Sequence, residues 1–383
     1  MMDIKNQHPK LLLPTFCAII VILGFQVGGL QLVLLRAVQE LNLGGAMMGL
    51  PLTAQFISLS VTPLVFGPIS DKIGKKKIIA AFMLVFSVGS FLTGLYGSVV
   101  LFLVGLFITG AGYSVCECSV TAAISDIFEK SREKYINLCQ SFFCVGAALS
   151  PLVLQWLMRT FSLPWRVSFF ICAIAMIITL PVFLLSYPKN LPKMEEQTSE
   201  QTGNSKRLLL LGFILCMLLY VGVEGSIAAF ADSLFTLELG MPVFGAYAIA
   251  LFWVCMGIGR SIFGRMKKIP QYATSISLIC MAVILFGIAF GRQEMLLLIL
   301  FAASGLACSC VWPGITNAAV ARNPGASGAV MSYLNLGAGV GGAVFPLIMS
   351  TGMEFTSLFT SFAILATFSL VAGIFMWRMN RKA

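Results

Sequence analysis

The feature that most constrains this chain is its division into apolar stretches of similar length. A helix needs about 20 apolar residues to cross a bilayer core of about 30 Å, and the sequence contains twelve such stretches. They run over residues 11–36, 45–66, 78–96, 99–125, 136–158, 166–187, 207–231, 243–264, 272–290, 295–320, 327–350 and 355–377. Because lipid offers no water to backbone polar groups, we expect each stretch to be a helix. The sequence therefore predicts an all-α membrane protein with twelve transmembrane helices.

The composition supports this class and excludes others. Charged residues make up 10% of the chain and hydrophobic residues 58%, whereas roughly a quarter of residues are charged in soluble domains. The net charge of +10 could indicate a nucleic-acid partner. However, the basic residues lie in short loops between apolar stretches, which is the pattern of a membrane topology signal. We therefore expect the lipid bilayer as the environment and no nucleic acid as a partner.

A short basic loop sets the expected orientation. Residues 67–77 read G-P-I-S-D-K-I-G-K-K-K between the second and third stretches, and the positive-inside bias places such a loop in the cytoplasm. Twenty-one of the 25 lysines and arginines then fall on the cytoplasmic side, if Arg260 is counted with the loop after 243–264. Both termini are expected in the cytoplasm, in a multi-pass protein of the cell (inner or plasma) membrane.

The chain divides into two halves around one long polar segment. Residues 188–206 form the only long polar run and are expected to be a cytoplasmic linker. Residues 1–187 and 207–383 would then be six-helix halves related by pseudo-symmetry, each with a similar order of residues. At an offset of about 195 residues, Gln140, Gly146 and Pro151 align with Asn335, Gly341 and Pro346. Two-half symmetry of this kind is typical of transporters with a central site, and we expect a monomer.

Two carboxyl groups lie unusually deep in the predicted membrane segments. Glu117 precedes Asp126, at the cytoplasmic end of its segment, by about 13 Å of helix. Glu224 precedes Asp232, at the external end, by about 12 Å. Neither has a basic residue within two turns of its own helix. An intramembrane acid is a functional candidate by default, so both are predicted to couple transport to protons; the alternative is a structural hydrogen bond to a neighbouring helix.

Uncharged polar and aromatic side chains at similar depth outline a possible solute site. Amides suit a ligand that is rich in hydroxyl groups, and indole rings offer flat apolar faces. The predicted substrate-binding residues are Gln26, Gln31, Gln140, Glu224, Trp253, Trp312, Asn317 and Asn335. In the repeat, Trp312 occupies the place of Glu117. Each amide could instead hold two helices together.

The chain offers little for a metal, a cofactor or an enzyme reaction. The single histidine is His8, near the N-terminus, and the eleven cysteines are scattered through apolar segments. A membrane enzyme would need a Ser/His pair or clustered acids. We therefore expect no metal, no cofactor and no enzymatic activity.

The loop at 67–77 also carries a family resemblance. Gly67, Asp71, Gly74, Lys75 and Lys76 match the pattern G-x-x-x-D-x-x-G-[KR]-[KR], which resembles the signature loop of the major facilitator superfamily. The resemblance implies that these five residues act in gating. It also implies that Asp71 contacts the neighbouring half and helps to latch the outward-open state.

Four further motifs resemble the fucose–galactose–glucose:proton symporter branch of that superfamily. They are Y-V-G-V-E at 220–224, G-x-G-R at 257–260, W-P-G at 312–314 and G-G-A-V-F-P at 341–346. The resemblance implies that Glu117 takes part in proton coupling. One departure concerns the 11–36 segment, where the fucose symporter carries an aspartate and this chain has only the uncharged Gln26 and Gln31. Fucose itself is thereby placed in doubt.

The sequence thus predicts a secondary transporter that imports a small neutral hydrophilic solute, a sugar or glycoside, together with protons by alternating access. The main alternative is a drug or metabolite exporter that exchanges its substrate for protons. Exporters of the superfamily commonly carry Gly-Pro-x-x-Gly-Gly in the fifth helix, and the segment 150–154 here, S-P-L-V-L, lacks the glycines. A passive binding or sensor protein is a third possibility, which uptake into vesicles would distinguish.

Overall fold

The computed structural model describes residues 11–95, 97–128, 132–187, 204–263, 265–266, 270, 272–323 and 327–381. Within these ranges, twelve helical segments are long and apolar enough to cross a membrane, which confirms the predicted fold class. The predicted linker lies outside them except for its last three residues, which begin a helix at Asn204 instead of ending a loop.

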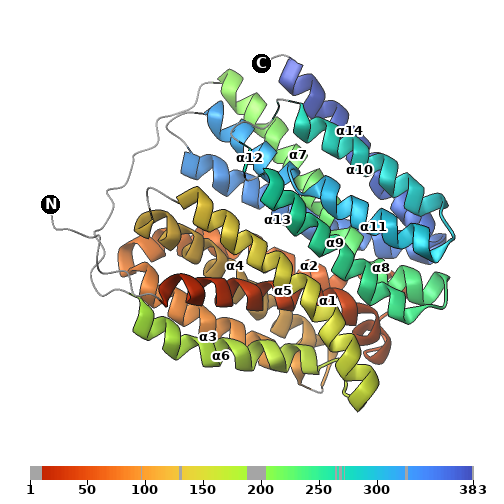
Figure 1. Cartoon of the computed structure of the whole chain (residues 1–383), viewed down its shortest axis with the longest axis horizontal. Helices are drawn as coiled ribbons and strands as arrows, with labels where there is room; N and C mark the ends of the chain where they lie inside the picture. Colours follow the sequence, from red (N-terminus) through yellow and green to blue (C-terminus); the bar gives the residue numbers. More distant parts are fainter. Residues whose placement is uncertain are drawn as a thin grey trace.

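Helices α1 to α6 pack together as an N-terminal half, and α7 to α14 pack together as a C-terminal half. Figure 1 shows the first group in red to yellow-green beside the second in green to blue. The N-terminal half contains α1 (Leu12–Glu40), η2 (Gly45–Met47), α2 (Leu50–Ile73), α3 (Lys75–Gly94), α4 (Val99–Ile127), α5 (Arg132–Phe161) and α6 (Val167–Ser186). The C-terminal half contains α7 (Asn204–Ala229), α8 (Ala231–Ser233), η4 (Leu234–Glu238), α9 (Pro242–Phe263), α10 (Ala273–Phe290), α11 (Glu294–Cys308), α12 (Val311–Ala321), α13 (Ser327–Phe355) and α14 (Leu358–Arg381).

The two halves use equivalent glycines at equivalent helix contacts. A Cβ atom built on Gly146 of α5 would lie 2.1 Å from the carbonyl oxygen of Val21 in α1. Its repeat partner is Gly341 in α13. A Cβ atom built on Gly341 would lie 2.0 Å from the carbonyl oxygen of Leu218 in α7. Backbones can approach this closely only where the side chain is absent. The glycines therefore fix the α1–α5 and α7–α13 contacts, which are the corresponding pairs of the two halves.

One predicted helix is in fact two. The segment expected at 295–320 divides into α11 and α12, which are separated by Ser309 and Cys310. Proline has no N–H group, so Pro313 cannot donate to the carbonyl of Ser309 four residues earlier. The backbone N–H of Ser309 donates to the carbonyl oxygen of Leu306, three residues earlier, at 3.2 Å. Pro313 thus accounts physically for the break.

The basic loop is a tight turn between α2 and α3. Gly74 has a φ of +102°, a backbone conformation that favours glycine, and it ends one helix and begins the next. Lys75 forms an ion pair with Asp126 at the end of α4. Lys76 donates to the carbonyl oxygen of Tyr187 at 3.2 Å. These contacts all lie within the N-terminal half.

Two of the five predicted gating residues stand apart from these contacts. Gly67 lies in α2, where a Cβ atom would have no neighbour within 4 Å. The side chain of Asp71 lies outside the described part of the structure, so its role as a latch stays a prediction.

Several hydrogen bonds join the two halves at the end of the bundle where α1 ends. Thr53 of α2 donates to the carbonyl oxygen of Ala343 in α13 at 2.6 Å, and Ser350 of α13 donates to the carbonyl oxygen of Ala46 at 2.8 Å. Side-chain hydroxyls thus satisfy backbone carbonyls across the boundary between the halves. These bonds hold this end of the bundle together.

Candidate functional site

A chain of polar side chains crosses from one half to the other near the centre of the bundle. Gln140 of α5 donates to Glu117 of α4 at 3.4 Å. Arg260 of α9 in turn donates to the amide oxygen of Gln140 at 3.3 Å. The same guanidinium group lies 3.9 Å from the carboxylate of Glu224 in α7. We call these four residues the central network.

Arg260 corrects one expectation and adds a partner that the sequence did not reveal. It belongs to α9 rather than to the basic loop, and only 19% of its side chain is exposed. It also supplies the cation that Glu117 and Glu224 lack within their own helices. Sequence reasoning missed this residue as a site residue because a basic residue at the end of an apolar segment also fits a loop. The available signal was the motif G-x-G-R, which places Arg260 three residues before the last helical residue, Phe263.

Each acid has a tyrosine four residues before it in the same helix. Tyr113 precedes Glu117 in α4, and Tyr220 precedes Glu224 in α7, so each pair shares one helix face. Each tyrosine also interacts with its glutamate. The hydroxyl of Tyr220 additionally donates to the carbonyl oxygen of Cys308, at the end of α11, at 3.0 Å. The recurring pattern Y-x-x-x-E was a sequence signal for both tyrosines.

Besides Gln140, two further predicted substrate-binding amides already have protein partners. Gln26 of α1 is 1% exposed and exchanges hydrogen bonds with Gln55 of α2, at 2.9 and 3.4 Å. Gln31 of α1 accepts from the indole N–H of Trp253 in α9 at 2.9 Å. Trp253 is itself 6% exposed, and its ring packs on Phe143. In this conformation Gln26, Gln31 and Trp253 hold helices together, and a solute could reach them only after the helices move.

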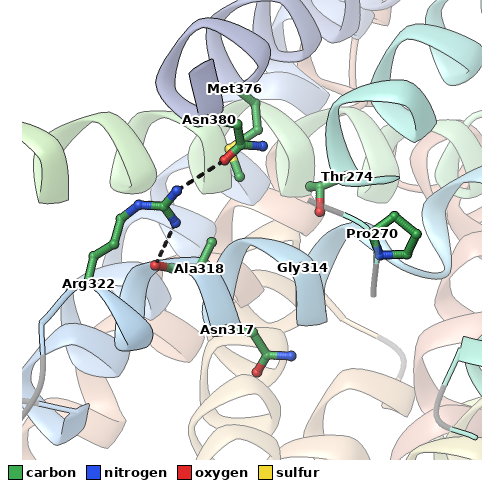
Figure 2. A pocket seen from close by; sticks show the side chains of 8 residues that line it. All are labelled: Pro270, Thr274, Gly314, Asn317, Ala318, Arg322, Met376 and Asn380. Carbon is green, nitrogen blue, oxygen red and sulfur yellow. Dashed lines mark hydrogen bonds between the residues drawn. The ribbon is translucent and has the colours of Figure 1, made fainter. Parts of the chain in front are cut away.

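The remaining three predicted residues do not belong to the central network. Trp312 and Asn335 are half-buried on α12 and α13. Asn317 is exposed and lines a cavity between α10, α12 and α14 (Figure 2). Among the described residues, no hydrogen bond or ion pair connects these three side chains to the central network.

A second ion pair joins the halves at the end where α1 ends. Arg36 of α1 lies 3.2 Å from Asp232 of α8 and donates to Gln155 of α5 at 3.4 Å. Asp232 is 1% exposed, and one of its carboxylate oxygens has no hydrogen-bond partner. Burial raises the pKa of Asp232 to about 7, although the neighbouring Arg36 acts in the opposite direction. In the sequence, Asp232 served only to mark the external end of its segment.

The fold and the site together define a class: a two-half helical membrane bundle with charged and amide groups linked across its centre. The sequence model of the Major Facilitator Superfamily matches residues 15–293. The chain therefore belongs to the Major Facilitator Superfamily, whose members are transporters rather than enzymes.

Curated relatives and solved structures resemble this chain in different ways. The multidrug resistance protein MdtL of Citrobacter koseri is 28% identical over 178 residues, which cover 45% of this chain and 44% of that protein. MdtL of Escherichia coli O157:H7 is 25% identical over 175 residues, with the same coverage. The chain thus spans less than half the length of these relatives.

Among solved structures, the E. coli fucose:proton symporter FucP has a TM-score of 0.67 and 19% identity, covering 97% of this chain and 99% of FucP. The peptide transporter POT has a TM-score of 0.76 and 16% identity, covering 98% and 96%. At these identities the likeness establishes the fold.

Proposed function

We propose that this protein imports a small neutral hydrophilic solute, a sugar or glycoside, together with protons. The observation that carries the proposal is the central network, in which one cation, Arg260, serves two carboxyl groups from opposite halves. An intramembrane acid of this kind is characteristic of proton pathways in transporters.

The charge balance of the network favours a neutral solute. When Glu117 is protonated, Arg260 and Glu224 balance each other and the network has no net charge. A neutral solute can then bind without leaving an uncompensated charge away from water. When Glu117 is ionised, two carboxylates share one guanidinium group and the network carries one excess negative charge. Protonation of Glu117 should therefore accompany solute binding.

The contacts at the end where α1 ends support an inward-facing conformation. Arg36, Asp232 and the hydroxyl-to-carbonyl bonds of Thr53 and Ser350 join the halves there. α4 and α12 end on the opposite side of the bundle, and among the described residues no hydrogen bond or ion pair joins these two helices. The halves do meet nearer that side through α5 and α9, where the hydroxyl oxygens of Ser141 and Ser261 lie 3.4 Å apart. With both termini in the cytoplasm of an inner or plasma membrane, as the basic loops favour, the closed end is external. In this scheme Asp71 acts as a latch for the opposite, outward-open state, and the protein works as a monomer.

A second candidate function is proton-driven export of a cationic drug or metabolite. The similarity of 45% of the chain to MdtL, a multidrug resistance protein, favours it. The excess negative charge of the deprotonated network would attract a cation. Proton and substrate would then compete for the same site, which is the opposite of the relation expected for import with protons.

The pH dependence of binding separates the two functions, because coupling between proton and solute is reciprocal. We would measure binding of sugars, glycosides and cationic drugs to purified protein by thermal shift between pH 5 and pH 8. A neutral solute that binds more tightly at low pH supports symport. A cation that binds more tightly at high pH supports export. If the best ligand of either kind binds equally at both pH values, proton coupling at the solute site is wrong.

A further inference from the structure

A cavity of about 210 Å³ opens in the C-terminal half, away from the central network. It lies where α10 begins and α14 ends, and α12 forms its third wall (Figure 2). Its lining consists of Pro270, Thr274, Gly314, Asn317, Ala318, Arg322, Met376 and Asn380. Four of these side chains are polar, namely Thr274, Asn317, Arg322 and Asn380.

The cation of this cavity, Arg322, has spare hydrogen-bond donors. Its guanidinium group donates to the carbonyl oxygen of Ala318 at 3.2 Å and to the amide oxygen of Asn380 at 3.5 Å (Figure 2). It also lies 5.5 Å from the centre of the Phe213 ring. A guanidinium group has five N–H donors, and both of these oxygens are uncharged acceptors. Within the described part of the chain, no carboxylate forms an ion pair with Arg322.

The charges at the corresponding position of the N-terminal half are different. There, Asp126 at the end of α4 pairs with Lys75 at the start of α3. At the repeat offset of about 195 residues, the place of Asp126 falls on Ala321, directly before Arg322. The C-terminal half thus has a cation where the N-terminal half has a neutralised pair. An anion from outside the protein could supply the missing charge.

The surroundings of the cavity indicate its depth in the membrane. Tyr272 and Trp377 flank it with their rings 4.6 Å apart, and Trp377 is 40% exposed. Tyrosine and tryptophan rings collect at the level of the lipid headgroups. Arg378 and Arg381 lie in the last turn of α14 beside them. The cavity is therefore at the depth where lipid phosphate groups are found.

We propose that this cavity binds a phosphate group, carried by an anionic lipid headgroup or by a soluble phosphate. Arg322 forms the charged contact, since a guanidinium fork matches two phosphate oxygens. The hydroxyl of Thr274 adds a neutral donor from α10, beside α12, whereas the amide of Asn317 points to the other side of α12 (Figure 2). A bound phosphate would hold these two helices and α14 together. This inference does not depend on the nature of the transported solute.

The test uses the purified full chain in a neutral detergent, with thermal unfolding as the readout. Phosphatidylglycerol, diacylglycerol with the same acyl chains, and inorganic phosphate are titrated separately. Phosphatidylglycerol should raise the melting temperature and diacylglycerol should not. Arg322→Gln should raise the half-saturating concentration about tenfold or more, the scale of a charge-assisted hydrogen bond. Arg378→Gln is the matched control, since it removes a neighbouring exposed arginine outside the cavity lining, and should change the concentration less than about twofold.

Thr274→Val provides a second variant that keeps the shape of the side chain and removes its hydroxyl. It should weaken binding several-fold, and it decides the question if Arg322→Gln does not fold. A shift with inorganic phosphate that Arg322→Gln abolishes supports the site and identifies a soluble source. A shift with phosphatidylglycerol alone identifies the lipid. The proposal is wrong if neither ligand shifts the wild type, or if the Arg322 and Arg378 variants respond alike.

Discussion

The N-terminal and C-terminal halves present the same pair of side chains to the centre of the bundle in different electrostatic settings. Tyr113 and Glu117 in α4 repeat the spacing of Tyr220 and Glu224 in α7. Glu224 lies 3.9 Å from the guanidinium group of Arg260, whereas Glu117 reaches that cation only through the amide of Gln140. A direct cation partner favours the ionised form of an acid, and a neutral amide does so less.

This difference teaches how one motif can serve two tasks. Arg260 comes from α9 of the C-terminal half, so Glu224 and its cation belong to the same half and move together. Glu117 and Gln140 belong to the other half. A rearrangement between the halves therefore changes the surroundings of Glu117 more than those of Glu224. We expect Glu117 to bind and release the proton and Glu224 to keep Arg260 in place.

The largest expected effect comes from removing the proton site. Glu117→Gln should abolish solute accumulation driven by an inward proton gradient, because an amide cannot titrate. Solute binding and counterflow exchange should persist, since they need only the loaded carrier. The measurement is uptake into proteoliposomes with an imposed gradient, beside exchange without one. Glu224→Gln is the matched variant and should act mainly on affinity. If the Glu224 variant loses accumulation and the Glu117 variant retains it, the two assignments must be exchanged.

Removing the shared cation should have the next largest effect. Arg260→Gln leaves Glu224, whose side chain is 13% exposed, without its ion-pair partner. Breaking one side of a fully buried ion pair costs about 3–5 kcal/mol, and we expect a loss of stability at or below the lower end of that range. Thermal or denaturant unfolding of the purified variant measures the loss of stability. Arg159→Gln, which removes an exposed arginine, is the control. The double variant Arg260→Gln with Glu224→Gln should recover part of the loss, and no recovery would show that the two groups are not coupled.

Trp312 sharpens the comparison because it occupies the repeat position of Glu117. Trp312→Ala should weaken solute binding by roughly 1–3 kcal/mol, the scale of burying one large apolar side chain. The same titration with Trp377→Ala, an exposed tryptophan of α14, serves as the control. Unchanged affinity in the Trp312 variant would make this ring a packing residue and remove α12 from the solute site.

The smallest expected effect distinguishes the two tyrosines. Tyr220→Phe removes a hydrogen bond to the carbonyl oxygen of Cys308 from a fully buried hydroxyl, which costs on the order of 1 kcal/mol of stability. Tyr113→Phe leaves no backbone carbonyl unpaired and should cost less. Parallel unfolding curves of the two variants test the order, and a larger loss for Tyr113→Phe would contradict it.

The fold could be predicted from the sequence because lipid imposes a length and a polarity on every spanning segment. The lysines at 72, 75, 76 and 77 and the acids at 117 and 224 stood out against this background. Their partners did not, since the sequence does not say which faces of separate helices meet. Arg260 lies far along the chain from Glu117, and Gln55 lies in the helix after that of Gln26. In both cases only the three-dimensional arrangement shows that the side chains meet. The break before α12 was not predicted, since prolines such as Pro151 and Pro346 lie inside continuous helices and only the structure shows that the helix divides before Pro313.

The break between α11 and α12 could link a change at Glu224 to a movement of α12. Tyr220 touches Glu224 on one side and donates to the carbonyl of Cys308, the last residue of α11, on the other. A shift of the glutamate can thus be transmitted directly to the hinge of a divided helix. Beyond that hinge, the eleven residues of α12 form a rigid lever that carries Trp312 and Asn317, and Arg322 follows directly at its end. A small rotation at Cys308 would move the far end of the lever by more than its near end.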